Sequence, residues 1–160
     1  MIVVADTSPV NYLILIGHIE ILRDLFGTVL IPQAVLLELK SGSAPSLVRD
    51  WAAKVPGWVE VQAVRSHLDP ATGDLGNGER EAIALSLEIH AELLVADDQA
   101  ARSEAQRLKI PVIGTLGVLR DAAMAGLLNL KEALDQLQQT SFHVSPDLIL
   151  SLLDEADSRV

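Results

Sequence analysis

Two acidic positions stand directly after short apolar runs. Asp6 follows residues 2–5 (Ile-Val-Val-Ala), and Asp97 with its neighbour Asp98 follows residues 93–96 (Leu-Leu-Val-Ala). Such runs are typical of strands that are covered on both faces of a parallel sheet. The carboxyl ends of parallel strands border the crevice where ligands bind, so we expect these acids at a functional site. For Asp6 a second interpretation stays open, in which it only caps the helix that starts near Pro9.

Further candidate acids lie on predicted helices. Glu38 lies within a helix predicted over residues 33–40, either as a solvated flank residue or as a residue that points into a cleft. Glu79 and Glu81 stand in the first turn of an apolar helix that runs to Ile89. The helix dipole favours negative charge there, and we interpret Glu79 in this way. Glu81 is closer to the buried part of that helix, so we favour it as the site residue.

These carboxylates predict a metal-dependent chemistry. Four of them can share one site at neutral pH only with a cation, because like charges at close range raise each other's pKa. Oxygen ligands suit Mg²⁺ or Mn²⁺, and such an ion supports hydrolysis of phosphodiester bonds. We therefore expect four catalytic acids, namely Asp6, Glu38, Glu81 and Asp97. We expect the metal ligands to be Asp6, Glu81, Asp97 and Asp98.

The elements that must position these acids alternate between strand and helix. Apolar runs predict strands at residues 2–5, 28–31, 58–61, 93–96 and 111–113, with helices between them. This alternation predicts an α/β fold with a parallel central sheet between two layers of helices. Two more helices, over residues 130–138 and 146–157, follow the last strand. Residues 65–77 have the composition of a surface loop near the site.

Composition limits the other chemistries. The chain has 160 residues, which suits one domain, and no cysteine, which excludes thiolate sites and disulfides. No glycine-rich phosphate loop, nucleophile motif or zinc-spaced histidine pair is present. A phosphate-accepting receiver domain would need a lysine after the last strand, where Gly-Thr-Leu stands instead. No membrane-spanning run or secretory signal is apparent, so we expect a cytoplasmic protein.

The ordered set of motifs resembles a PIN domain, and within that family the VapC-like branch. The resemblance rests on Asp-Thr-Ser-Pro at residue 6, the Glu of residues 35–40, Gly-Glu-Arg-Glu at residue 78, Val-Ala-Asp-Asp at residue 95, and Val-Ile-Gly-Thr at residue 112. It covers residues 1–126 and implies a Mg²⁺- or Mn²⁺-dependent ribonuclease, commonly a homodimer and the toxin of a toxin–antitoxin pair. Residues 127–160 form a helical extension that would pack on the same domain or on a dimer partner.

The resemblance also implies how RNA is bound. Asp6, Glu38, Glu81 and Asp97 fall on the four acids of the family. Many of its toxins have Asp where Glu81 stands, and Glu79, two residues earlier, competes for the role of the third acid. Thr7, Ser8 and Thr115 fall where the family places hydroxyls. Net charge is −10, so we expect RNA contacts from basic residues near the acids, namely Lys40, Arg80 and Arg102.

A second function class stays open at this point. The acidic charge and the 3% of aromatic residues are also compatible with a PIN-like module that has lost catalysis and binds a protein or an RNA. Binding of Mn²⁺ discriminates between the two, because such a module need not bind the ion.

Overall fold

The computed structural model describes residues 1–66 and 75–157, with side chains to Glu155. Most of the surface loop predicted over residues 65–77 lies outside the described residues. Within the described residues the strands form one parallel sheet in the order β3-β2-β1-β4-β5. The predicted parallel sheet is confirmed. Strand β1 lies at its centre, between β2 and β4, so Asp6 follows the middle strand.

The helices and strands follow the predicted alternation. The strands are β1 (Val3–Ala5), β2 (Val29–Pro32), β3 (Val59–Gln62), β4 (Leu93–Val95) and β5 (Val112–Ile113). The helices are α1 (Thr7–Leu15), α2 (Ile21–Phe26), α3 (Gln33–Lys40), α4 (Ser46–Ala53), α5 (Asn77–Glu88), α6 (Gln99–Arg107), α7 (Thr115–Met124), α8 (Leu130–Gln138) and α9 (Pro146–Asp157).

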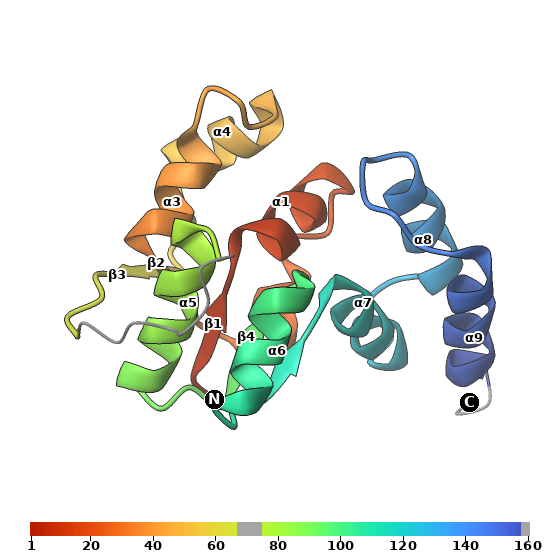
Figure 1. The fold of residues 1–160 in the computed structure, drawn as a ribbon. Helices are drawn as coiled ribbons and strands as arrows, with labels where there is room; N and C mark the ends of the chain where they lie inside the picture. The colour runs from red at the N-terminus through yellow and green to blue at the C-terminus, as the bar shows by residue number, and fades with distance from the viewer. Residues whose placement is uncertain (67–74, 158–160) are drawn as a thin grey trace.

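The sheet carries a hydrophobic core on each face, as the predicted three layers require. Side chains alternate along a strand, so neighbouring residues of β1 enter different cores. Val3 and Ala5 pack with residues of α1, α2, α7 and α8. Val4 packs with residues of α5 and α6, which lie side by side (Figure 1). Both cores contain fully buried aliphatic side chains, so β1 and the residue after it are held rigidly.

Two helices begin earlier than the sequence suggests, and both changes affect the site. Helix α1 begins at Thr7, so Pro9 is its third residue rather than its first. Proline is tolerated there because first-turn amides have no partner within the helix. For helix α7 the sequence predicts a turn over residues 114–117 and a helix from Val118, whereas the helix begins at Thr115. Thr7 and Thr115 are therefore the first residues of their helices.

The C-terminal helices belong to the same packed body. Leu130, Leu134 and Leu137 of α8 are buried in the core that contains α1 and α7. Helix α9 contacts α7 and α8, and Arg120 on α7 pairs with Glu155 on α9 at 3.6 Å. Figure 1 shows α7, α8 and α9 grouped at one end of the molecule, with α3 and α4 at the other. In the part of the chain that the structure describes, no helix has the length and apolar character needed to cross a membrane.

Candidate active site

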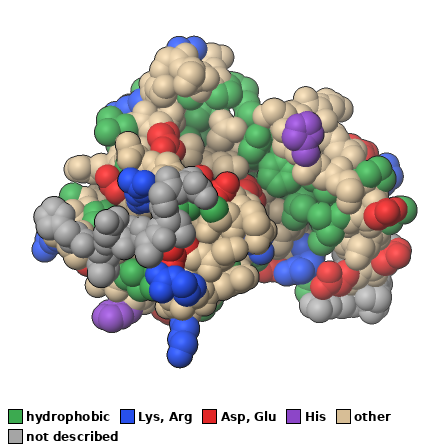
Figure 2. Space-filling view, viewed as in Figure 1, with side chains coloured by type: hydrophobic (Ala, Val, Ile, Leu, Met, Phe, Trp, Pro, Cys, Tyr) green, Lys and Arg blue, Asp and Glu red, His purple; other side chains and the backbone are tan. Residues whose placement is uncertain are grey.

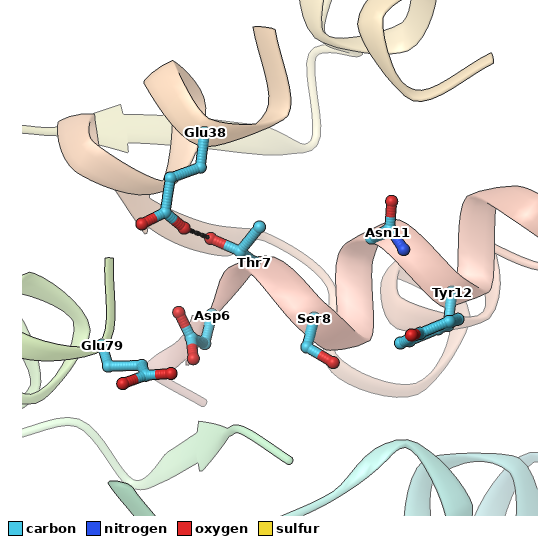
Figure 3. Close-up of a pocket in the computed structure, with 7 residues that line it drawn as sticks. All are labelled: Asp6, Thr7, Ser8, Asn11, Tyr12, Glu38 and Glu79. Carbon is cyan, nitrogen blue, oxygen red and sulfur yellow. Dashed lines mark hydrogen bonds between the residues drawn. The ribbon is translucent and has the colours of Figure 1, made fainter. Parts of the chain in front are cut away.

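A pocket of about 210 Å³ opens where α1 begins, beside the carboxyl end of β1. Residues from α1, α3 and α5 surround it, so three segments far apart in the sequence meet there. Its lining residues are Asp6, Thr7, Ser8, Asn11, Tyr12, Glu38 and Glu79 (Figure 3).

Asp6 is buried in this pocket and does not act as an ordinary helix cap. It occupies the N-cap position of α1 with an extended backbone, yet its side chain makes no capping hydrogen bond. The residue is 3% exposed, and its Oδ1 has no hydrogen-bond partner among the described residues. The pKa of Asp6 is raised from 3.8 to about 7, chiefly by burial; the Thr7 amide lowers the pKa, and the charges of Glu79, Glu38 and Asp97 contribute to the rise.

Glu38 is oriented by two donors from different helices. Its Oε2 accepts a short hydrogen bond from the Thr7 hydroxyl (Figure 3), and its Oε1 accepts from the Gly78 amide at 3.0 Å. A Cβ at residue 78 would lie 2.5 Å from Glu38 Oε2, so this approach requires glycine. Of the two interpretations that the sequence left open for Glu38, the structure supports the one in a cleft.

Asp97 is held by three donors. Its Oδ1 accepts from the Thr115 amide at 2.7 Å, and its Oδ2 accepts from the hydroxyls of Ser8 at 2.9 Å and Thr115 at 2.6 Å. A Cβ at Gly114 would lie 3.0 Å from Asp97 Oδ1. The sequence placed these two hydroxyls at the site, and the structure ties both of them to one carboxylate. Asp97 itself does not line the pocket; Ser8 connects it to the pocket wall.

The structure separates the two acids at the start of α5. Glu79 lines the pocket, and its Oε2 also accepts from the Gly76 amide at 3.0 Å, as a helix-start residue does. Burial raises the pKa of Glu79, as do the nearby charges of Asp98 and Glu38, while the Gly76 amide lowers it. Glu81 instead turns to α3, where its Oε1 accepts from the Ala34 amide at 3.1 Å. Glu81 therefore satisfies a first-turn amide of α3 and does not line the pocket.

Asp98 and the predicted basic residues lie around the pocket rather than in it. Asp98 is the N-cap of α6, and its Oδ2 accepts from the Ala101 amide at 3.0 Å. Arg102 reaches the neighbourhood of Asp97, because a Cβ at Gly114 would lie 2.8 Å from its Nη1. Arg80 follows Glu79, and its buried Nε has no hydrogen-bond partner among the described residues. Lys40 is exposed at the end of α3.

The acids of the described residues do not form a complete metal-binding site. Among the described residues no three Asp, Glu or His side chains lie close enough together to hold a metal ion. Glu38 and Asp97 are each occupied by donors on both oxygens. The unpartnered oxygen of Asp6 is the one acceptor in the described pocket that is buried and left without a donor.

Two residues of the pocket wall have no counterpart among the sequence predictions. Asn11 and Tyr12 lie one helical turn after Thr7 and Ser8, so they extend the same two faces of α1 along the pocket. That i and i+4 spacing was the available signal. It requires knowing that α1 begins at Thr7 and that Ser8 faces the site.

Comparisons with known proteins agree with this fold. A family model described as "DUF3368: PIN domain" matches residues 2–158, and its match includes the C-terminal helices. Among solved structures, the chain is similar to a PilT N-terminus domain protein from the hyperthermophilic archaeon Sulfolobus solfataricus P2. The TM-score is 0.51 at 23% identity, and the similarity covers 91% of this chain and 100% of that one. No curated protein matches the sequence. Because the family model spans nearly the whole chain, the chain belongs to the PIN-domain family DUF3368.

Proposed function

We propose that this chain is a Mg²⁺- or Mn²⁺-dependent endoribonuclease that hydrolyses phosphodiester bonds of RNA. The observation that carries the proposal is Asp6, a buried carboxylate with an unpartnered oxygen that faces the charges of Glu79, Glu38 and Asp97. Carboxylates are gathered in this way at the cost of electrostatic repulsion, which a divalent cation would relieve. The PIN-domain fold, which is nuclease-like, supports the same function.

The residues present fit such an ion by their chemistry. Asp6 offers a buried oxygen without a donor, and Glu79 lines the same pocket with a raised pKa. We propose these two carboxylates as the protein ligands, with Glu79 rather than Glu81 as the third family acid. When bound, the ion would supply charge neutralisation at the phosphate and activation of water.

The other site residues support the two ligands. Glu38 fixes the Thr7 hydroxyl, and Asp97 fixes the hydroxyls of Ser8 and Thr115. A hydroxyl that donates to a carboxylate keeps its lone pairs for an incoming donor, such as a water molecule or a ribose hydroxyl. Glu38 and Asp97 thus act as positioning residues, and their hydrogen bonds fix the first turn of α1 against the pocket.

The function is tested by comparing the parent protein with Asp6→Asn. Asn keeps the size of the side chain, and Asp6 makes no capping hydrogen bond that the change could remove, so the fold should be kept. We expect Mn²⁺ to raise the melting temperature of the parent and to support RNA cleavage, and both effects should be lost in Asp6→Asn. A parent that cleaves equally well in chelator and gains no stability from Mn²⁺ would rule out the mechanism.

A binding module without catalysis is the second candidate. It is favoured by the lack, among the described residues, of three acids placed to hold a metal. The same comparison with and without Mn²⁺ decides between the two, because such a module should not cleave RNA and need gain no stability from Mn²⁺.

We further propose a role as the toxin of a VapC-like toxin–antitoxin pair. A short neighbouring reading frame that encodes an antitoxin with a DNA-binding segment would support it, and an isolated gene would count against it.

We also propose a homodimer. Leu148 and Leu150 of α9 are 43% and 60% exposed, and Figure 2 shows hydrophobic side chains on the surface near the C-terminal helices. Sedimentation as a monomer at micromolar concentration would contradict the dimer.

A further inference from the structure

Tyr12 is the only tyrosine of a chain that has just five aromatic residues. It lies on α1 one turn after Ser8 and lines the acidic pocket. Figure 3 shows Asp6, Ser8 and Tyr12 following one another along α1, with the Tyr12 ring at the end away from Glu79. The pocket therefore has an acidic end and an aromatic end.

The Tyr12 ring is fixed by the segment that joins α8 to α9. Its hydroxyl lies 2.7 Å from Ser141 Oγ, in an exposed hydrogen bond. Its ring centroid lies 4.9 Å from that of Phe142, with an interplanar angle of 86°. Edge-to-face pairs of this kind are favourable contacts, so the C-terminal extension fixes the orientation of a ring at the edge of the site. Two of the five aromatic side chains thus meet beside the pocket.

Asn11 adds a polar group to the same wall. It lines the pocket beside Tyr12, and its side-chain amide makes no hydrogen bond with any described residue. An amide offers both a donor and an acceptor, which is what recognition of a base edge requires. An aromatic face next to an amide matches the way proteins hold an unstacked base of single-stranded RNA.

We propose that Tyr12 and Asn11 form a base-binding subsite for single-stranded RNA, and that Ser141 and Phe142 hold it in place. This subsite rests on the proposed ribonuclease function, in which the neighbouring phosphate lies at the acidic end. A base stacks on the Tyr12 ring, and the Asn11 amide contacts its edge. Duplex RNA does not enter in this way because its bases are already stacked. The C-terminal extension is therefore part of substrate recognition.

The experiment uses a labelled single-stranded RNA and copies of it with one abasic ribose at each position in turn. Tyr12→Leu removes the aromatic face and keeps apolar volume, whereas Tyr12→Phe keeps the ring and loses only the Ser141 hydrogen bond. We expect Tyr12→Leu to weaken binding between about 5-fold and 100-fold, and Tyr12→Phe to stay within about threefold of the parent. In Mn²⁺ the loss should appear in KM with kcat nearly unchanged.

The abasic series separates stacking from a merely structural role. At one position the missing base should weaken binding by the parent but cause no further loss in Tyr12→Leu. Asn11→Ala is a second variant that leaves the ring in place, and it should change the preferred base at that position. A Tyr12→Leu protein with a lower melting temperature but an unchanged Kd would mean that Tyr12 only fastens the C-terminal segment, and would overturn the subsite.

The outcomes also distinguish this subsite from the proposed function. If Asp6→Asn abolishes cleavage while Tyr12→Leu keeps the KM of the parent, the nuclease stands and the subsite is wrong. If the parent neither binds nor cleaves RNA in Mn²⁺, both proposals are overturned together.

Discussion

At the scale of single residues, Asp6 opposes folding whenever it is ionised. Its pKa is 3.8 ordinarily and about 7 in the folded protein, mainly because it is buried. A raised carboxyl pKa means that the folded state holds its proton to a higher pH than the unfolded chain does. Stability is therefore lost as pH rises from about 4 to 7, and the loss is complete above 7. One pKa unit corresponds to about 1.4 kcal/mol, so Asp6 costs up to about 4 kcal/mol there.

We predict that the parent in chelator becomes less stable, relative to Asp6→Asn, between pH 5 and pH 8. Asn carries no charge, so the variant lacks this contribution while it keeps the other carboxylates near Asp6, namely Glu79, Glu38 and Asp97. Urea unfolding of both proteins at each pH measures the difference in free energy. Mn²⁺ at pH 8 should restore the stability of the parent alone. If the difference in unfolding free energy between the two proteins does not change with pH, the pKa of Asp6 is not raised to about 7.

Glu79 and Glu81 provide a matched pair at the same scale. Glu79→Gln and Glu81→Gln each remove one charge, and each keeps an oxygen that accepts from the Gly76 or the Ala34 amide. We predict that Glu79→Gln raises the Mn²⁺ concentration needed for half-maximal stabilisation by roughly tenfold or more, because loss of even an outer-shell partner of a metal ligand has an effect of this size. Glu81→Gln should stay within about twofold, because its carboxylate serves α3. If both variants lose Mn²⁺-induced stabilisation equally, Glu81 contributes to metal binding as much as Glu79 does, which would contradict the proposal.

At the scale of elements, the start of α5 is shaped by its approach to Glu38. Alanine at residue 78 would favour the helix by about 1 kcal/mol, yet its Cβ would lie 2.5 Å from the Glu38 carboxylate. We predict that Gly78→Ala displaces Glu38 and reduces Mn²⁺-dependent cleavage. Gly76→Ala is the control two residues earlier, since its Cβ would lie 3.9 Å from Glu79. Cleavage rates and melting temperatures of both variants test this, and equal activity of the two would contradict it.

The elements were predictable because local patterns fix them. Unbroken apolar runs such as residues 93–96 indicate buried parallel strands, and acids after such runs must meet at one sheet edge. The direction of single side chains was not predictable. Both Glu79 and Glu81 occupy the first turn of α5, and the packing of α5 on α3 decides which of them faces the pocket. The position of the Tyr12 ring at the pocket was not predictable either, because its partners Ser141 and Phe142 lie far away in sequence.

At the scale of the whole molecule, the net charge of −10 repels RNA at long range. Any RNA contact must then come from local cations, and we expect it from Arg102, Arg80 and Lys40. Arg102 approaches the same glycine as Asp97, and Arg80 follows Glu79 directly. On single strands each lost phosphate contact lowers the salt slope by about 0.7. Loss of all three contacts would lower it by about 2.

We predict this change in slope for the triple variant Lys40→Gln, Arg80→Gln and Arg102→Gln. Its control is Arg23→Gln, Lys109→Gln and Lys131→Gln, which changes net charge equally at residues that neither line the pocket nor stand beside Glu38, Glu79 or Asp97 in the sequence or at Gly114. Affinity for a single-stranded RNA is measured in chelator over a range of salt concentrations. Only the site triple should flatten the dependence; the control should lower affinity slightly through net charge alone. If both triple variants show the same salt dependence, RNA affinity depends on the net charge of the protein and not on basic residues beside Asp6. If neither differs from the parent, the RNA binds elsewhere on the molecule.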